Sequence, residues 1–243
     1  MLTTRRPLRA AVLCSRRAPG LVDLLERDRR RGEAYEIACV VTSEATFAEE
    51  RRRSGKTAVL EATARAFGRS ARLGVLVGDL ATDSDARRVR SAGIVAEAIT
   101  TGSACHLDAE MVHKGLHRLP WRELDYLFIE NVGNLVCPAV YDLGQAANVV
   151  ALSVTEGEDK PLKYPTMFHK ADLVLLTKVD LLAALDGDIR QIEKNLTLVM
   201  PRPAMLTVSA KTGAGITPWL RWLAGVGRPR GAPCAVGSGA GLA

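Results

Sequence analysis

The alternation of apolar runs and helical stretches predicts the fold of this chain. Four short, nearly continuous apolar runs are bounded by polar residues or glycine, and they lie at residues 73–77, 126–129, 149–154 and 173–176. Runs of this kind are typical of strands buried on both faces of a parallel sheet. Because helical stretches separate the runs, the pattern predicts an α/β protein: a mostly parallel sheet with helices on both faces.

The N-terminal part has a different pattern from this central body. Residues 10–14 and 35–42 each favour a strand, and residues 21–30 favour a basic helix. Together they predict an atypical β-α-β segment over residues 1–48, which could add the strand that precedes the main helix. This segment resembles the start of a formyltransferase domain, although that family's catalytic Asn-His-Asp set is absent. A gene fusion or truncation, with its junction near residues 47–53, is an open alternative.

The C-terminal part ends the predicted domain. A strand is expected at residues 205–208, and a last helix at 217–223 has Pro218 near its start, where proline is tolerated. After residue 225 the chain is rich in Gly, Pro, Ala and Ser and has no periodicity, which is typical of disorder. We therefore expect an atypical segment, a main domain and a disordered tail, over residues 1–48, 49–226 and 227–243.

A phosphate-binding motif opens the first helix of the main domain. Ser54, Gly55, Lys56 and Thr57 form the second half of the signature G-x-x-x-x-G-K-[ST], and a helical pattern follows over residues 58–67. In that signature the lysine neutralises phosphate charge, and the hydroxyl ligates Mg²⁺. Backbone N–H groups at the helix start also attract the anion. The alternative is an ordinary helix N-terminus.

The first half of the same signature is altered. Glu50 stands where the signature has glycine, and three arginines, ending at Arg53, follow it. Glycine is needed at such positions because the loop adopts positive φ angles close to the phosphates. Arginines can compensate for charge, but they cannot restore the backbone conformation. The sequence therefore predicts weakened phosphate binding.

Two strand-end loops favour guanine over adenine. The apolar run at residues 173–176 leads to Lys178 and Asp180, whose carboxylate can accept from both N1–H and the 2-amino group of guanine. Adenine lacks the 2-amino group, so each charged hydrogen bond offers roughly 1.5–3 kcal/mol of discrimination. The strand at 205–208 is followed by a loop that contains Ser209, Ala210 and Lys211. This loop resembles the G5 element, whose backbone N–H meets the guanine O6. The alternative is that each of the two loops is an ordinary surface loop after a strand.

The region between residues 101 and 139 carries candidate metal ligands. Cys105 and His106 are adjacent, and Cys137 follows a strand that ends in the carboxylate Glu130. Thiolate and imidazole ligands suit Zn²⁺ and Ni²⁺, and these three leave a position for water or a second subunit. The alternative is that both cysteines are small buried apolar residues.

Two further histidines and a glycine belong to this region. His113 and His117 have i, i+4 spacing on the following helix, where we expect a solvated face rather than ligation. Gly133 follows the strand-end carboxylate Glu130, as in P-loop proteins that hold magnesium and sense the γ-phosphate at such a position.

These motifs together resemble a known family, the hydrogenase maturation nickel-incorporation GTPases of the SIMIBI class of P-loop proteins. The resemblance covers about residues 54–226. It is specific in the middle of the chain, and the motifs that carry it lie at residues 78–86, 101–109, 130–139 and 153–161. The urease accessory GTPases, which are related, differ from this chain around residues 105–108.

The resemblance implies a role for each motif residue. Lys56 corresponds to the phosphate lysine, and Thr57, Asp79 and Glu130 correspond to the residues around magnesium and the attacking water. The resemblance therefore implies GTPase catalysis by the side chains of Asp79, Glu130 and Lys56. The implied Ni²⁺ or Zn²⁺ site at the dimer interface consists of Cys105, His106 and Cys137. Guanine recognition maps onto Lys178 and Asp180, but Thr177 stands where asparagine is usual.

The implied function is GTP-dependent nickel insertion during [NiFe]-hydrogenase maturation, with hydrolysis impaired by the altered loop. The implied cofactors are GTP, Mg²⁺ and Ni²⁺ or Zn²⁺. The implied partners are a second copy in a GTP-dependent homodimer, the hydrogenase large subunit and a companion nickel-binding maturation protein. The alternatives are a non-hydrolysing nickel- or zinc-binding scaffold and a urease-type accessory GTPase.

Composition agrees with a cytoplasmic protein that acts without membrane or nucleic acid. The formal charge is +6 at pH 7, but the positive excess lies before residue 73 and is not interleaved with aromatic residues, which favours a solvated surface over nucleic-acid binding. The five cysteines have no secreted disulfide spacing. No apolar run reaches 18 residues, and no signal-peptide pattern is evident.

Overall fold

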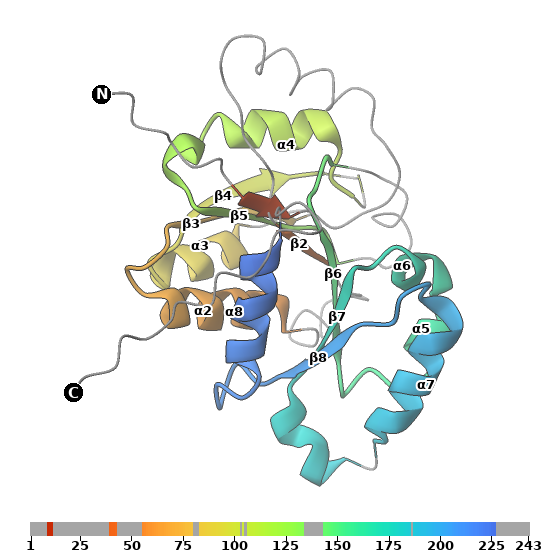
Figure 1. Ribbon diagram of the computed structural model, residues 1–243. Helices are drawn as coiled ribbons and strands as arrows, with labels where there is room; N and C mark the ends of the chain where they lie inside the picture. The colour runs from red at the N-terminus through yellow and green to blue at the C-terminus, as the bar shows by residue number, and fades with distance from the viewer. Residues whose placement is uncertain are drawn as a thin grey trace, which may run out of the picture.

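A parallel sheet forms the centre of the computed structural model (Figure 1). The strand order is β4-β3-β5-β2-β6-β7-β8, with β1 paired to β5 beside β2, and every pairing is parallel. The strands are β1 (Arg9–Ala11), β2 (Cys39–Thr42), β3 (Leu73–Asp79), β4 (Val95–Thr100), β5 (Tyr126–Glu130), β6 (Asn148–Ser153), β7 (Leu173–Thr177) and β8 (Met205–Val208). The structure describes residues 9–11, 39–42, 55–79, 83–102, 104, 106–133, 143–185 and 187–226.

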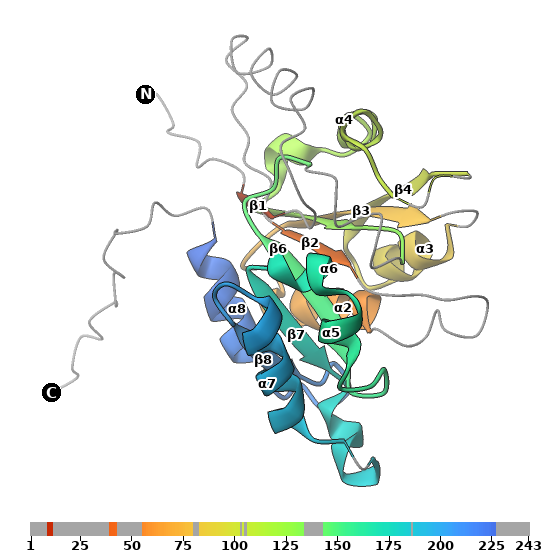
Figure 2. The same ribbon diagram turned by 90° about the vertical axis from the view of Figure 1, so that its right-hand side faces the viewer.

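Helices cover both faces of the sheet, as the apolar pattern predicts (Figures 1 and 2). One face carries α2 (Lys56–Phe67), α3 (Ser84–Ser91) and α8 (Ile216–Gly225). The other carries α4 (Ala109–Leu116), α5 (Lys160–Lys163), α6 (Pro165–His169) and α7 (Ile189–Val199). Two 3-10 helices, η2 (Trp121–Glu123) and η4 (Val179–Ala184), complete the described elements.

The inner strands are where the sequence places them. Every residue of β5 and β7 is buried, and β3 and β6 are buried except at one end. Two-sided burial explains why these strands are nearly continuous apolar runs. The predicted α/β fold with a parallel sheet is therefore confirmed, with strand ends shifted by one or two residues.

The N-terminal strands belong to the same sheet. β2 lies between β5 and β6, with Val40 opposite both Ile129 and Asn148. β1 pairs with the first part of β5, so that Arg9 lies opposite Tyr126. The strand that a phosphate loop normally follows is thus supplied by β2, and residues 43–54 connect it to α2.

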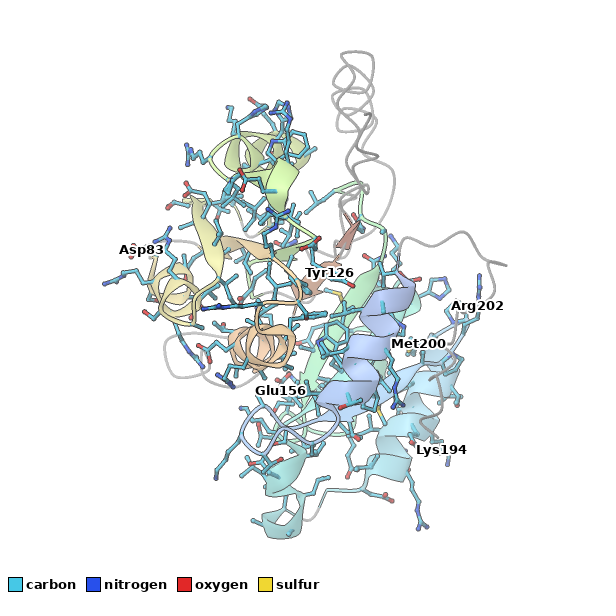
Figure 3. The ribbon with its side chains drawn as sticks, turned by 60° about the vertical axis from the view of Figure 1, so that its left-hand side comes forward. Asp83, Tyr126, Glu156, Lys194, Met200 and Arg202 are labelled. Carbon is cyan, nitrogen blue, oxygen red and sulfur yellow. The ribbon has the colours of Figure 1, made fainter. Side chains whose placement is uncertain are left out.

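Contacts between elements fix α2, which carries the phosphate motif. The buried Trp219 of α8 donates its ring N–H to the Thr63 hydroxyl at 2.9 Å. Phe67, at the end of the helix, stacks on Tyr126 with ring centroids 5.2 Å apart, and Tyr126 lies in the interior (Figure 3). Arg88 of α3 forms a two-pronged ion pair with Glu61, and the pKa of Arg88 is raised, chiefly by that hydrogen bond.

Several predicted features lie outside the described residues: the helix at 21–30, the altered loop with Glu50, Arg53 and Ser54, the ligands Cys105 and Cys137, and the tail at 227–243. Within the described residues, no helix is long and apolar enough to cross a membrane.

Candidate nucleotide and metal site

The phosphate motif lies at the carboxyl end of the sheet, where the strands point into the start of α2. Gly55 has φ = 74°, and a Cβ there would approach the Thr177 hydroxyl oxygen to 3.3 Å. Glycine is therefore favoured both by backbone conformation and by space. The helix begins at Lys56, whose side chain is buried and directed at the end of β5.

Glu130 is the buried acceptor at that end of β5. Its side chain is 3% exposed and accepts from the Thr57 hydroxyl at 3.1 Å, while the Lys56 ammonium lies 3.7 Å away. Burial raises the pKa of Glu130, although Lys56 opposes the shift. The structure thus brings together three of the predicted nucleotide-site residues.

Asp79 ends the neighbouring strand β3 and is only partly buried. Its backbone carbonyl accepts from the Thr101 N–H at 3.0 Å. The Thr101 hydroxyl in turn donates to the Ala104 carbonyl at 2.6 Å. The segment that leads into Cys105 and His106 is therefore anchored on the end of β3.

Asn131 anchors the other end of the same segment. Its buried side-chain oxygen accepts from the backbone N–H groups of Leu107, at 3.1 Å, and Val132, at 2.8 Å. Its carbonyl accepts from the Lys56 ammonium at 3.0 Å. Leu107 is fully buried over Gly78, where a Cβ would lie 2.9 Å from the leucine side chain. Thr101 and Leu107 are thus attached to the ends of β3 and β5.

His106 is the predicted metal ligand whose position the structure describes. Its ring is partly buried, and burial lowers its pKa, although Asp108 opposes the shift. A lowered pKa favours the neutral imidazole that metal binding requires. Asp108 caps α4 by accepting from the Met111 N–H at 2.8 Å. Among the described residues, no group of three or more His, Cys, Asp or Glu side chains could hold a metal ion.

The predicted guanine loops follow the neighbouring strands β7 and β8, so they lie side by side at the carboxyl end of the sheet. Asp180 accepts from the Ser209 hydroxyl at 2.6 Å, which joins the loop after β7 to the loop after β8. Lys178 adopts a left-handed conformation with φ = 59°. Ala210 accepts from Arg65 of α2 at 3.5 Å. Thr177 is buried, and Lys211 is exposed.

Comparison with known proteins matches residues 53–207 to the family "CobW/HypB/UreG, nucleotide-binding domain". This chain belongs to that family. Among curated proteins, several hydrogenase maturation factors named HypB are similar to this chain in sequence. The factor from Azotobacter vinelandii is 54% identical over 170 residues, which cover 70% of this chain and 56% of the relative. The factor from Escherichia coli K12 is 48% identical over 170 residues, which cover 70% and 59%. The chain therefore spans less than two thirds of these relatives' length.

Solved HypB structures agree with the family assignment. HypB from Helicobacter pylori in complex with nickel has a TM-score of 0.73 and 35% identity, covering 84% of this chain and 92% of the other. HypB from Archaeoglobus fulgidus has a TM-score of 0.70 and 37% identity, covering 84% and 95%. The P-loop class predicted from the sequence is thus confirmed.

The sequence did not predict a role for Asn131, although this residue lies inside the motif at residues 130–139. A buried asparagine directly after a strand-end carboxylate was the available signal, because a buried amide needs hydrogen-bond partners. Gly133 lies two residues further on and is partly buried.

Proposed function

We propose that this chain is a GTP-binding accessory protein that inserts nickel during [NiFe]-hydrogenase maturation. The observation that carries the proposal is the attachment of the segment around Cys105 and His106 to the ends of β3 and β5. Asp79 and Glu130, the nucleotide-side carboxylates, end those two strands. The HypB relatives, which are hydrogenase maturation factors, support the proposal.

The phosphate end fits a magnesium–nucleotide complex. Asp79 and Glu130 end the neighbouring strands β3 and β5, and Thr57 lies in the first turn of α2. All three offer oxygen ligands, which Mg²⁺ prefers. These residues would hold Mg²⁺, which when bound would neutralise charge on the phosphates. Lys56 would turn from its present partners to the β- and γ-phosphates, and the backbone at Ser54 and Gly55 would line the phosphate loop.

The base end fits guanine. Asp180 would accept from N1–H and the 2-amino group, and its hydrogen bond from Ser209 holds the carboxylate in one orientation. The aliphatic part of Lys178 would cover the base, and backbone N–H groups at Ala210 and Lys211 would meet O6. Thr177 lacks the reach of asparagine, which would lower affinity for the base.

Asn131 would couple the two sites. Lys56 donates to the Asn131 carbonyl, and the Asn131 side chain accepts from the backbone N–H of Leu107, next to His106. Phosphate binding would draw Lys56 away from that carbonyl. The end of β5 could then shift and carry the metal segment with it, which would let GTP change metal affinity.

The cargo would be Ni²⁺, with Zn²⁺ as the competing ion, bound by Cys105, His106 and Cys137. Three soft ligands leave room for a ligand from a second subunit, which supports a GTP-dependent homodimer. Transfer would then proceed to the hydrogenase large subunit, helped by a companion nickel-binding maturation protein. Gly133 would lie on the γ-phosphate side and report hydrolysis to this segment.

Slow hydrolysis is part of the proposal. Glu50 and Arg53 occupy loop positions whose backbone would wrap the phosphates, and they favour other backbone conformations than glycine does. A second candidate function follows from the same positions: a nickel- or zinc-binding scaffold that binds nucleotide without turning it over.

Calorimetric titration with Ni²⁺, with and without Mg²⁺–GTP, tests the metal site and its coupling together. Cys105→Ala and Cys137→Ala should each weaken binding at least tenfold, about 1.4 kcal/mol. Cys14→Ala, Cys39→Ala and Cys234→Ala serve as matched controls and should change little. Mg²⁺–GTP should change nickel affinity at least about fivefold, and Asn131→Ala should reduce that ratio towards one.

The outcomes separate the two candidate functions. Equal losses at all five cysteines would indicate adventitious thiol binding and reject the metal site. Nickel binding that depends on Cys105 and Cys137 but ignores nucleotide would favour the scaffold. A thermal melt of Asn131→Ala shows whether lost coupling reflects lost folding instead.

A further inference from the structure

The solvent side of α4 carries a pair of histidines outside the site described above. Val112, Gly115 and Leu116 bury the opposite side of this helix against the sheet. Glycine at 115 allows a close approach, because a Cβ there would lie 2.9 Å from Ile99. The helix is therefore held firmly, and the other side faces water.

The two imidazoles on that side face one another, and each ring presents its Nε2 atom to the other. The Nε2 atoms of His113 and His117 are 3.2 Å apart, with ring centroids 4.5 Å apart in an edge arrangement. This distance implies a hydrogen bond in which one Nε2 donates its proton and the other Nε2 accepts. If the donating ring changed tautomer, so that its proton moved from Nε2 to Nδ1, both Nε2 atoms would be acceptors at the same separation.

That separation fits one metal ion shared by both rings. With metal–nitrogen distances of about 2.0–2.1 Å, two nitrogens 3.2 Å apart subtend an angle of about 100–105° at the ion. This nitrogen–metal–nitrogen angle lies between the angle of two adjacent ligands in octahedral coordination and the angle of two ligands in tetrahedral coordination. The two nitrogens would therefore keep their separation in the chelate, and the rings would turn so that both lone pairs point at the ion.

The charges around the pair also suit a cation. Both histidines lie at the C-terminal end of α4, where the helix dipole favours positive charge. The neighbouring cations are each paired: Lys114 with Glu110 at 2.7 Å, and Arg118 with Glu97 at 3.0 Å. Their repulsion of a bound ion is therefore reduced.

We propose that His113 and His117 form a second, surface site for a divalent transition metal. Imidazole nitrogen suits Ni²⁺, Zn²⁺ and Cu²⁺, and affinity should rise from Ni²⁺ to Cu²⁺, with Mg²⁺ excluded. Waters complete the coordination, so the ion exchanges readily. Since α4 directly follows the segment with Cys105 and His106, the site would hold the proposed cargo within about one helix length, roughly 12 Å, of those ligands. Only this role as a staging site rests on the proposed function; binding itself does not.

The test uses the full chain with Cys105→Ser and Cys137→Ser, so that the thiolates do not mask a weaker site. Ni²⁺ and Cu²⁺ are titrated into this background and into His113→Gln, His117→Gln and the double variant. Glutamine keeps helix propensity close to that of histidine or better. Each single change should weaken binding at least tenfold, and the double change should cost no more than about twofold beyond either single one, because one shared ion is lost only once.

His169→Gln is the matched control, since His169 is an exposed histidine on a different helix whose ring lies 3.3 Å from the Val199 carbonyl. It should leave binding unchanged. Additive losses at positions 113 and 117, or an equal loss at 169, would overturn the shared site. Imidazole nitrogen NMR of the background protein decides the matter without those substitutions: both Nε2 signals should shift together with Zn²⁺, and absence of a shift at either would overturn the proposal.

Discussion

The two ends of the proposed nucleotide site are built in different ways. At the guanine end, the loops after β7 and β8 are joined by the hydrogen bond from Ser209 to Asp180. At the phosphate end, α2 begins directly at Lys56, but β2 ends at Thr42, and the altered residues of the phosphate signature lie between them. One end depends on side chains at strand ends, and the other on the backbone of a loop.

This difference shows which half of a nucleotide site tolerates sequence change. Asp180 lies in η4, three residues after β7 ends, and it keeps its position as long as the sheet forms, because the strand and this short helix fix its backbone. A phosphate loop works through N–H groups whose direction depends on each φ and ψ angle. Substituting glycine therefore affects phosphate binding before it affects base choice.

The largest expected effect comes from repairing the phosphate end. Glu50→Gly with Arg53→Gly should raise single-turnover GTP hydrolysis by up to about 100-fold, since loss of one oriented donor costs about 10²–10³ in rate. The gain requires that β2 also directs the chain correctly into the loop. Rapid hydrolysis by the unchanged protein would contradict this account of the loop.

An intermediate effect is expected at the guanine end. Asp180→Ala should reduce the preference for GTP over ATP by about 10- to 100-fold, since roughly 1.5–3 kcal/mol is lost per charged hydrogen bond. Competition between the two nucleotides in a binding assay measures it. Asp159→Ala, an exposed carboxylate that pairs with Lys163, is the control. Retained guanine preference without Asp180 would assign base recognition elsewhere.

The smallest expected effect concerns pH and the nucleotide-free protein. Burial raises the pKa of Glu130 above its ordinary 4.5, so in the window above that value the folded protein holds a proton that the unfolded chain has released. Glu130 should therefore make the free energy of unfolding fall as pH rises through this window. The Glu130→Gln variant has no ionisable group at this position. Its free energy of unfolding, relative to that of the unchanged protein, should therefore increase with pH. Denaturant melts across the window measure this, and a constant difference would show that Glu130 titrates normally.

The apolar pattern predicted the strands that are buried on both faces, since their sequence must be apolar throughout. It did not predict β4, because this edge strand contains Glu97 and an exposed Val95 and so lacks a continuous apolar run. The Asp180 and Glu130 positions followed from strand ends. The link through Asn131 depends on how Thr101 and Leu107 lie against the ends of β3 and β5, and no local pattern encodes that.

The position of β2 also bears on how the molecule assembles during synthesis. Among the strand pairings described, β4-β3-β5 and β6-β7-β8 are joined only through β2. Of the seven strands in this order, β2 leaves the ribosome first, yet its two neighbours, β5 and β6, follow roughly 85 residues later or more. Its edges stay unpaired during that interval, and such edges favour association with other chains. Until β5 and β6 have been synthesised, β2 lacks both strands that it pairs with in the sheet, which makes this stage the one most exposed to chaperone binding or misassembly.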